Sequence, residues 1–153
     1  MVYISKQDEA WDITETIIMK MSDVCAARNV RFAIVTISMP VQVHPDHAMR
    51  TSLNKDLGVD TLFYVDKRLA NFVQENGIPV FNPTPQMHKY SKTEQTFLHG
   101  FEGNLGSGHW NVNGHLFAGQ AIADWLIELE DMRNQQVKMF WNEYSSCLGD
   151  GRY

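Results

Sequence analysis

Residues 31–38 of the chain read RFAIVTIS, an almost unbroken run of apolar and β-branched side chains. A strand with one face in water alternates apolar and polar residues, whereas a strand covered on both faces is apolar along its length. Strands of the second kind occur mainly in parallel sheets that helices cover on both sides. The segment therefore favours an α/β arrangement, in which Pro40 ends the strand.

Helical patterns flank this strand. Residues 9–29 place apolar side chains three and four positions apart, which predicts an amphipathic helix with its apolar face in the core. We expect a shorter helix after Pro45, ended by Gly58, and another over residues 66–76, with Gly77 directly after it. Each glycine stands where helices commonly end.

The second half of the chain adds one strand and a long helical pattern. Residues 78–81 predict a short strand, which is followed by a proline-containing loop. A helix is expected from Asn113 onward, with an apolar side that packs on the core. A further stripe at helical spacing closes the core or provides a surface for self-association, and it comprises Val137, Phe140, Trp141, Tyr144 and Leu148.

The order helix, strand, helix, strand, loop, helix predicts a doubly wound, mainly parallel sheet with flanking helices. Two strands are too few for such a sheet. Either further strands lie near residues 62–65 and 96–98, or the chain is the later part of a larger α/β domain. We divide the chain into an α/β part, residues 1–134, and a C-terminal helical extension, residues 135–153.

Charge and hydropathy exclude several kinds of partner. A formal net charge of -5 and a pI near 5.6, without any cluster of basic residues, argue against nucleic acid. The chain has no run of 18 apolar residues, and acidic residues occupy the N-terminal stretch, so we expect no membrane partner and a cytoplasmic location. Cys25 and Cys147 form no metal-binding or disulfide pattern, and we expect no cofactor.

Residues 106–126, GSGHWNVNGHLFAGQAIADWL, join a glycine-rich turn to a strong helical pattern. The turn requires glycine and asparagine, but it does not require His109 or Trp110. A histidine in a loop that follows the last strand lies at the edge where α/β proteins place functional groups. A neutral imidazole can take a proton from a hydroxyl group and return it to a leaving group. His109 is therefore the candidate catalytic residue, and the alternative is a histidine held by the hydrogen bonds of a tight turn.

Neighbouring residues are interpreted as supports for this loop. We expect Trp110 to pack against the sheet edge, Asn111 to help the chain enter the helix and Ser107 to serve the turn. His115 is expected to bond back to the loop from the first helical turn. The spacing of His109 and His115 does not match zinc ligands on one helical face, so a metal site is not predicted here.

A second pair of histidines, His44 and His47, stands on either side of Pro45 and is a weak metal candidate. Proline between them predicts a turn, and an exposed polar loop is the expected outcome.

Four segments resemble the C-terminal part of the SGNH, or GDSL-type, hydrolase superfamily. The final conserved segment of that family has a catalytic histidine in a loop, then Asn, then Gly-His, then an Ala- and Leu-rich helix, and residues 106–126 match this order. The likeness extends to RFAIVTISMPVQVHPD, to RLANFVQENGIPVFNP and to FLHGFEGNLGSGHWN. The resemblance covers the chain from about residue 9 to residue 126 and implies the flavodoxin-like SGNH fold without its N-terminal strand.

The resemblance assigns one catalytic residue to this chain, the histidine carried over onto His109. The family's nucleophile is a serine in a Gly-Asp-Ser turn, which is absent here, as is Gly-x-Asn-Asp. Gly106 and Ser107 stand where the family has the aspartate that orients the histidine, and Glu102 is the nearest carboxylate in the sequence. Ser38 lacks the adjacent glycines that a nucleophile elbow requires.

These departures make a partial hydrolase the main functional hypothesis. The resemblance implies metal-free hydrolysis or transfer of an ester acyl group, with an ester or acylated carbohydrate as substrate and His109 as general base and then general acid. Without its nucleophile the chain is expected to be inactive alone. Two alternatives stay open: a non-enzymatic α/β module for binding or homo-oligomeric assembly, and an enzyme that combines His109 with Ser38 or with a metal.

Overall fold

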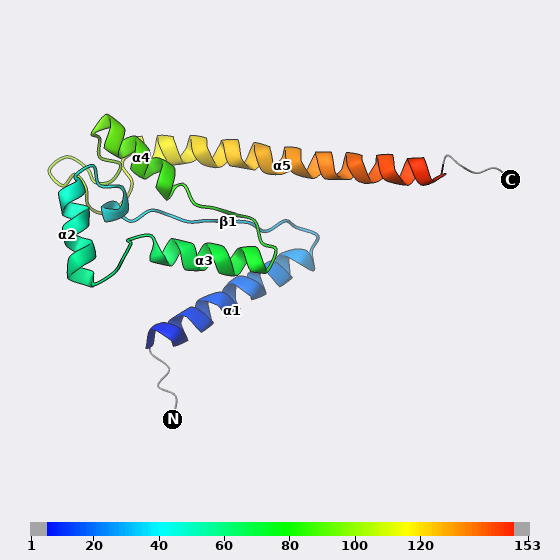
Figure 1. Cartoon of the computed structure of the whole chain (residues 1–153), viewed down its shortest axis with the longest axis horizontal. Coiled ribbons are helices and arrows are strands. Elements are labelled where there is room, and N and C mark those ends of the chain that lie inside the picture. The colour runs from blue at the N-terminus through cyan, green and yellow to red at the C-terminus, as the bar shows by residue number, and fades with distance from the viewer. Residues whose placement is uncertain (1–5, 149–153) are drawn as a thin grey trace, which may run out of the picture.

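A computed structural model of the chain describes residues 6–148, and it describes the backbone alone at residues 6, 7, 137 and 140–148. The described part is mainly helical (Figure 1). Its elements, in chain order, are α1 (Lys6–Ala26), β1 (Ile34–Val35), the 3-10 turn η1 (Pro40–Val43), α2 (His47–Leu57), α3 (Tyr64–Glu75), β2 (Val80–Phe81), α4 (Thr84–Glu94) and α5 (Val112–Leu148).

The two predicted strands exist and pair in parallel, with Ile34 opposite Val80 and Val35 opposite Phe81. Phe81 stacks on Trp125 of α5 with ring centroids 5.4 Å apart, so this helix covers one face of the pair. In Figure 1 the strands run between α5 and α3.

The prediction of a doubly wound sheet is wrong, because the sheet of the described chain has two strands only. The segments in which further strands were expected do not add strands to the sheet. Residues 62–63 form the turn before α3, and residues 96–98 are irregular and lead to a single antiparallel bridge between His99 and Trp110. The backbone of residues 98–100 is paired locally with the loop that follows it, so it does not extend the sheet.

Helix ends follow the sequence closely. The carboxylate of Asp46 accepts a hydrogen bond of 2.8 Å from the backbone N–H of Ala48 and caps α2. Gly58 ends the same helix in the left-handed conformation, at φ 64°, and Gly77 follows α3 at φ 69°. Helix α4, where the sequence predicted a loop, contains Pro85 in its first turn, a place where the missing N–H of proline breaks no hydrogen bond.

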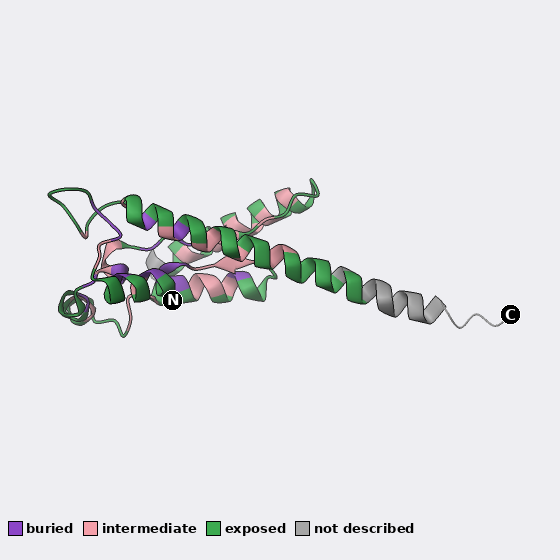
Figure 2. Cartoon of the chain, turned by 90° about the horizontal axis from the view of Figure 1, so that it is seen from above, coloured by how far each residue is buried: buried purple, intermediate pink, exposed green. Residues whose placement is uncertain are grey.

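The core is small and lies at one end of the molecule. Val43, Met87, Leu98 and Ala118 are almost fully buried, and Trp110, Phe117 and Ile122 pack against them. Figure 2 shows the buried residues gathered toward the end where α5 begins. The core therefore lies beneath the loop that precedes α5, which is where the histidine-containing segment is found.

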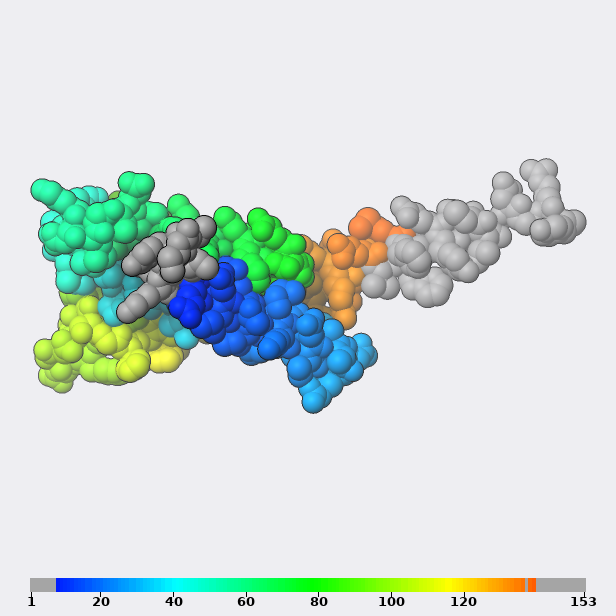
Figure 3. Space-filling model, turned by 90° about the horizontal axis from the view of Figure 1, so that it is seen from below, coloured from blue at the N-terminus to red at the C-terminus, as the bar shows by residue number. Residues whose placement is uncertain are grey.

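Helix α1 packs on α3 through polar contacts rather than through the stripe predicted to face the core. The guanidinium of Arg68 lies 4.5 Å from the ring centroid of Trp11 and 3.6 Å from a carboxylate oxygen of Glu15. The predicted inner face is instead about half exposed, and Figure 3 shows the helix lying along the surface. The exposed side chains are Ile13, Ile17, Met21 and Val24.

Helix α5 is continuous across residues 134 and 135 and extends past the rest of the molecule (Figures 1 and 2). The predicted C-terminal stripe lies on this helix, but its side chains fall outside the described residues; they are Val137, Phe140, Trp141, Tyr144 and Leu148. None of the described helices is both long and apolar enough to cross a membrane.

One buried carboxyl gives a testable stability prediction. Asp66, in the first turn of α3, accepts a hydrogen bond of 2.5 Å from the side-chain amide of Gln42, and burial raises the pKa of its carboxyl. Because the native carboxyl holds its proton to higher pH than the unfolded one, stability falls as the pH rises from about 3.8 through the raised pKa. Asp66→Asn keeps an acceptor for Gln42 and removes the buried charge. Thermal melts should show a higher Tm for the variant at pH 7, and a difference that persists unchanged in acid would contradict this origin.

Candidate active site

The chain that leaves β1 brings a serine into the interior. Thr36 and Ser38 are buried, whereas Ile37 and Met39 between and after them are exposed. This alternation is that of an extended strand, in which successive side chains point to opposite faces. Ser38, which is 4% exposed, therefore points inward just before η1 turns the chain away.

Two hydrogen bonds join Ser38 to the segment before α5, and a third joins His99 to the loop. The indole N–H of Trp110 donates to the Oγ of Ser38 at 2.8 Å. The same oxygen lies 3.1 Å from Nε2 of His99, and Nδ1 of His99 lies 2.9 Å from the carbonyl oxygen of Gly108. A serine and an imidazole thus form a pair, and a main-chain carbonyl occupies the position that a carboxylate has in a Ser-His-Asp triad.

The carbonyl oxygen of Gly108, next to Nδ1 of His99, determines the direction of each hydrogen bond. A carbonyl oxygen can only accept, so Nδ1 of His99 carries the hydrogen. In the neutral ring Nε2 is then an acceptor for the hydroxyl of Ser38, whose other acceptor within reach is the weaker Sδ of Met87 at 3.8 Å. The tautomer is the one that a general base for this serine requires.

The environment keeps the imidazole neutral. His99 is 3% exposed, and burial lowers the pKa of its ring below the ordinary value of 6.5, with a smaller contribution from the neighbouring His109. The hydrogen bond to Gly108 opposes this shift. A neutral ring at pH 7 can accept a proton, as general base catalysis requires.

Backbone hydrogen bonds hold the two ends of the loop together. The N–H of Gly100 donates to the carbonyl of His109, and the N–H of Gly106 donates to the carbonyl of His99, each at 2.9 Å. Gly106 has φ 81°, and a Cβ at this position would come within 2.8 Å of the His44 ring. A residue with a side chain would be strained here, which is why the loop needs this glycine.

Asn111 connects the loop to α5. Its side-chain oxygen accepts from the N–H of Gly114 at 3.0 Å, and its amide donates to the carbonyl of Phe97 at 2.8 Å. These are the contacts of a helix N-cap.

A pocket of about 290 Å³ opens beside Ser38. It is lined by Ile37, Ser38, His99, Gly108, His109, Trp110 and His115. Ser38, His99, His109 and Trp110 therefore line one space, large enough for a small acyl group with part of its alcohol.

The residues predicted from the sequence lie in and around this pocket. His109 lines it and is exposed, and no hydrogen bond of its side chain is found among the described residues. Trp110 packs against the core, and its indole N–H donates to the Oγ of Ser38. His115 is exposed and contacts the indole edge-on, with ring centroids 5.6 Å apart, while Ser107 lies exposed in the turn.

His99 was not identified from the sequence as a candidate. It stands between Leu98 and Gly100 without a motif, and its role depends on a contact with Ser38 across 61 positions of the chain. The only local signal in the sequence is that His99 follows two apolar residues, Phe97 and Leu98. A histidine in such a position more often has a structural role. Glu102 is exposed, and among the described residues no contact joins it to either histidine.

No metal site is found in the described part of the chain, where no three His, Cys, Asp or Glu side chains come close enough to share an ion. His44 and His47 have other partners. Nδ1 of His44 accepts from the N–H of Asp46 at 3.1 Å, and Nδ1 of His47 lies 3.1 Å from the hydroxyl of Thr51.

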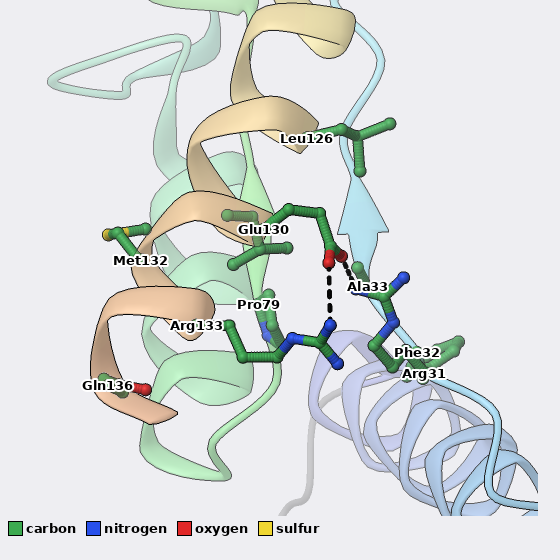
Figure 4. A pocket seen from close by; sticks show the side chains of 10 residues that line it. Arg31, Phe32, Ala33, Pro79, Leu126, Glu130, Met132, Arg133 and Gln136 are labelled. Atoms are coloured by element: carbon green, nitrogen blue, oxygen red, sulfur yellow. Dashed lines mark ion pairs between the residues drawn. The ribbon is translucent and has the colours of Figure 1, made fainter. Parts of the chain in front are cut away.

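A larger groove, of about 590 Å³, lies elsewhere, between α5 and the segments that lead into the two strands. Figure 4 shows Glu130 between Arg31 and Arg133, with which it forms ion pairs. The remaining lining is mainly apolar, and no nucleophile with a base is present there. Size alone would favour this groove, but the chemistry favours the smaller pocket at Ser38.

Comparisons of the chain with protein-family models, with curated proteins and with solved structures gave no match.

Proposed function

We propose that the chain hydrolyses esters or transfers ester acyl groups, with Ser38 as nucleophile and His99 as general base. The observation that carries this proposal is the hydrogen-bonded series from Ser38 through His99 to the carbonyl of Gly108, at 3.1 and 2.9 Å, beside an open pocket. The resemblance of residues 106–126 to SGNH hydrolases supports the same reaction class. The proposal differs from the resemblance in the nucleophile, because the Gly-Asp-Ser turn of the family is not found in this sequence.

The proposed reaction follows from the hydrogen-bond directions. The Oγ of Ser38 attacks the ester carbonyl carbon while its proton passes to Nε2 of His99. The protonated ring then gives this proton to the departing alcohol oxygen, which leaves an acyl group on Ser38. The oxygen of water, or of an acceptor hydroxyl in the transfer reaction, then attacks the acyl carbon while its proton passes to the same nitrogen. As the bond from the acyl carbon to Oγ breaks, the ring returns this proton to Ser38, which restores the free serine and neutral His99. The carbonyl of Gly108 holds the ring in place and helps to stabilise its charged form.

His109 is proposed to contact the substrate rather than to activate the nucleophile. Its side chain lines the pocket and is exposed, whereas His99 is the ring within hydrogen-bond distance of the serine oxygen. His109→Ala should therefore raise KM more than it lowers kcat.

Hydrolysis of short 4-nitrophenyl esters by the purified chain tests the proposal. His99→Gln should lose hydrolysis to near the uncatalysed rate, and His109→Ala should retain measurable turnover. Loss of activity in His109→Ala with full activity in Ser38→Ala would instead favour the role of His109 that the resemblance implies.

The proposed role of His99 determines whether kcat/KM rises or falls with pH. Only neutral His99 accepts the serine proton, and burial lowers the pKa of this ring below 6.5. We expect kcat/KM to rise with pH to a plateau, with its midpoint below 6.5. A profile that rises only above neutral pH would contradict His99 as the base.

The same shift affects stability. Between the lowered native pKa and about 6.5 the unfolded ring binds a proton that the native ring does not, so the free energy of unfolding falls as the pH falls through this range. In His99→Gln this part of the pH dependence should disappear from urea unfolding curves.

Self-assembly through a second copy of the chain is a second candidate function, and a specific observation favours it. Four large apolar side chains on one face of α1 are each at least half exposed: Ile13 (55%), Ile17 (52%), Met21 (50%) and Val24 (51%). A contiguous apolar stripe of this kind is typical of contact surfaces. Light scattering after size exclusion should show a dimer that Ile17→Glu converts to monomer, whereas a monomeric wild-type chain would exclude this candidate.

A further inference from the structure

A third cavity, of about 250 Å³, lies between α2, the turn before α3 and α4, and its two charged lining side chains, Arg50 and Lys92, are cations. Arg50, Lys92, His47 and His88 line it, and no carboxylate does. It shares no lining residue with the Ser38 pocket.

Arg50 is the buried cation of this cavity. It is 7% exposed, and its guanidinium donates to the main-chain carbonyl of His44. A guanidinium has five N–H groups, and among the described residues this carbonyl is the one acceptor found for them. Burial lowers the pKa of Arg50, which the nearby carboxylate of Asp46 opposes, while that carboxylate itself caps α2. A buried cation with unused donors is stabilised by an anion.

Two further groups have free hydrogen-bonding capacity. Nδ1 of His88 donates to the carbonyl of Gln42 at 2.8 Å, so Nε2 of the neutral ring is left as an acceptor for a ligand hydroxyl. The side-chain oxygen of Asn54, which also lines the cavity, is buried without a hydrogen-bond partner. This oxygen requires a donor, which a hydroxyl on the ligand would supply.

We propose that this cavity binds a small oxyanion, a phosphate or carboxylate group that carries an O–H next to its charge. The anion accepts from the guanidinium of Arg50, Lys92 contributes charge at the cavity, and the ligand hydroxyl donates to Asn54. The proposal goes beyond ester hydrolysis and does not depend on it.

Amide chemical shifts of the ¹⁵N-labelled full chain test the site with inorganic phosphate as the probe. Saturable shifts confined to residues 47–54 and 88–92, absent with sodium chloride at equal ionic strength, are expected. The same titration with acetate and with lactate separates the ligand classes. Saturation by phosphate alone assigns a phosphate group, and saturation by lactate more tightly than by acetate assigns a hydroxycarboxylate. Shifts no larger than those caused by chloride, with all three anions, overturn the proposal.

Variants locate the binding. Lys92→Gln should weaken phosphate binding by roughly two- to fivefold, as for a partly exposed charge. Arg50→Gln should weaken it by about tenfold or more, since hydrogen bonds from a charged donor are lost. Lys89→Gln, on the same helix but outside the cavity lining, is the matched control and should bind as the wild type does. Equal affinity in Lys92→Gln and Lys89→Gln would overturn the assignment, and this comparison holds even if Arg50→Gln does not fold.

Discussion

Ser38→Ala is expected to reduce ester hydrolysis by at least about a thousandfold, since removal of a serine nucleophile leaves little beyond binding and electrostatic effects. The variant should still bind substrate, because the pocket lining other than the Oγ is retained. Steady-state hydrolysis of 4-nitrophenyl acetate, compared with the buffer rate, measures the loss.

The control for this variant is Ser107→Ala, because Ser107 is an exposed serine in the loop next to the pocket. It should keep the wild-type rate. Ser38→Ala also leaves the indole N–H of Trp110 and Nε2 of His99 without their partner, at about 1–3 kcal/mol for each buried group. Circular dichroism and the Tm therefore have to show that the variant is folded at the assay temperature. A folded Ser38→Ala variant with unchanged kcat would show that this serine is not the nucleophile.

Gly114→Ala is expected to destabilise the chain. Gly114 lies in the first turn of α5, and a Cβ there would overlap the carbonyl oxygen of Leu98 and come within 3.1 Å of Trp110. Main-chain atoms cannot move aside as a flexible side chain can, so we expect a loss of about 1–3 kcal/mol in the free energy of unfolding. Hydrolysis should fall as well, since Leu98 is next to His99 and Trp110 binds Ser38.

Gly119→Ala provides the matched comparison on the same helix. A Cβ at Gly119 meets no atom within 4 Å, so the substitution should stabilise the chain by up to about 1 kcal/mol through helix propensity alone. Urea unfolding of both variants measures the two changes. Equal effects of the two substitutions would contradict the close approach of α5 to Leu98.

The elements that depend on local chemistry were predicted from the sequence. Gly58 and Gly77 end helices because the left-handed backbone there suits glycine, and Asn111 caps α5 because its short side chain reaches the free N–H groups of the first turn. The parallel strands at residues 31–38 and 78–81 follow from their apolar character, although the paired parts are only Ile34–Val35 and Val80–Phe81.

Features that depend on distant contacts could not be predicted in this way. The apolar periodicity of residues 9–29 indicates a helix, but it does not show that Trp11 and Glu15 on another face contact α3 while Ile17 remains exposed. The number of strands in the sheet likewise depends on partners that no local pattern defines.

The candidate site was predicted in part. The loop around His109 was identified, because a histidine and a tryptophan in a glycine-rich turn are not needed for the turn itself. The pairing of Ser38 with His99 was missed, since a serine without flanking glycines and a histidine without a motif carry no signal until the fold brings them to 3.1 Å.

Covalent labelling tests the central proposal most directly. Incubation of the chain with diisopropyl fluorophosphate, which phosphorylates activated serines with loss of fluoride, should give one adduct that peptide mass spectrometry locates on Ser38. Labelling should be slower by orders of magnitude in His99→Gln, because the serine then has no base. Absence of an adduct on Ser38 in a chain that hydrolyses esters, or labelling at equal rates in the wild type and His99→Gln, would contradict the Ser38–His99 site.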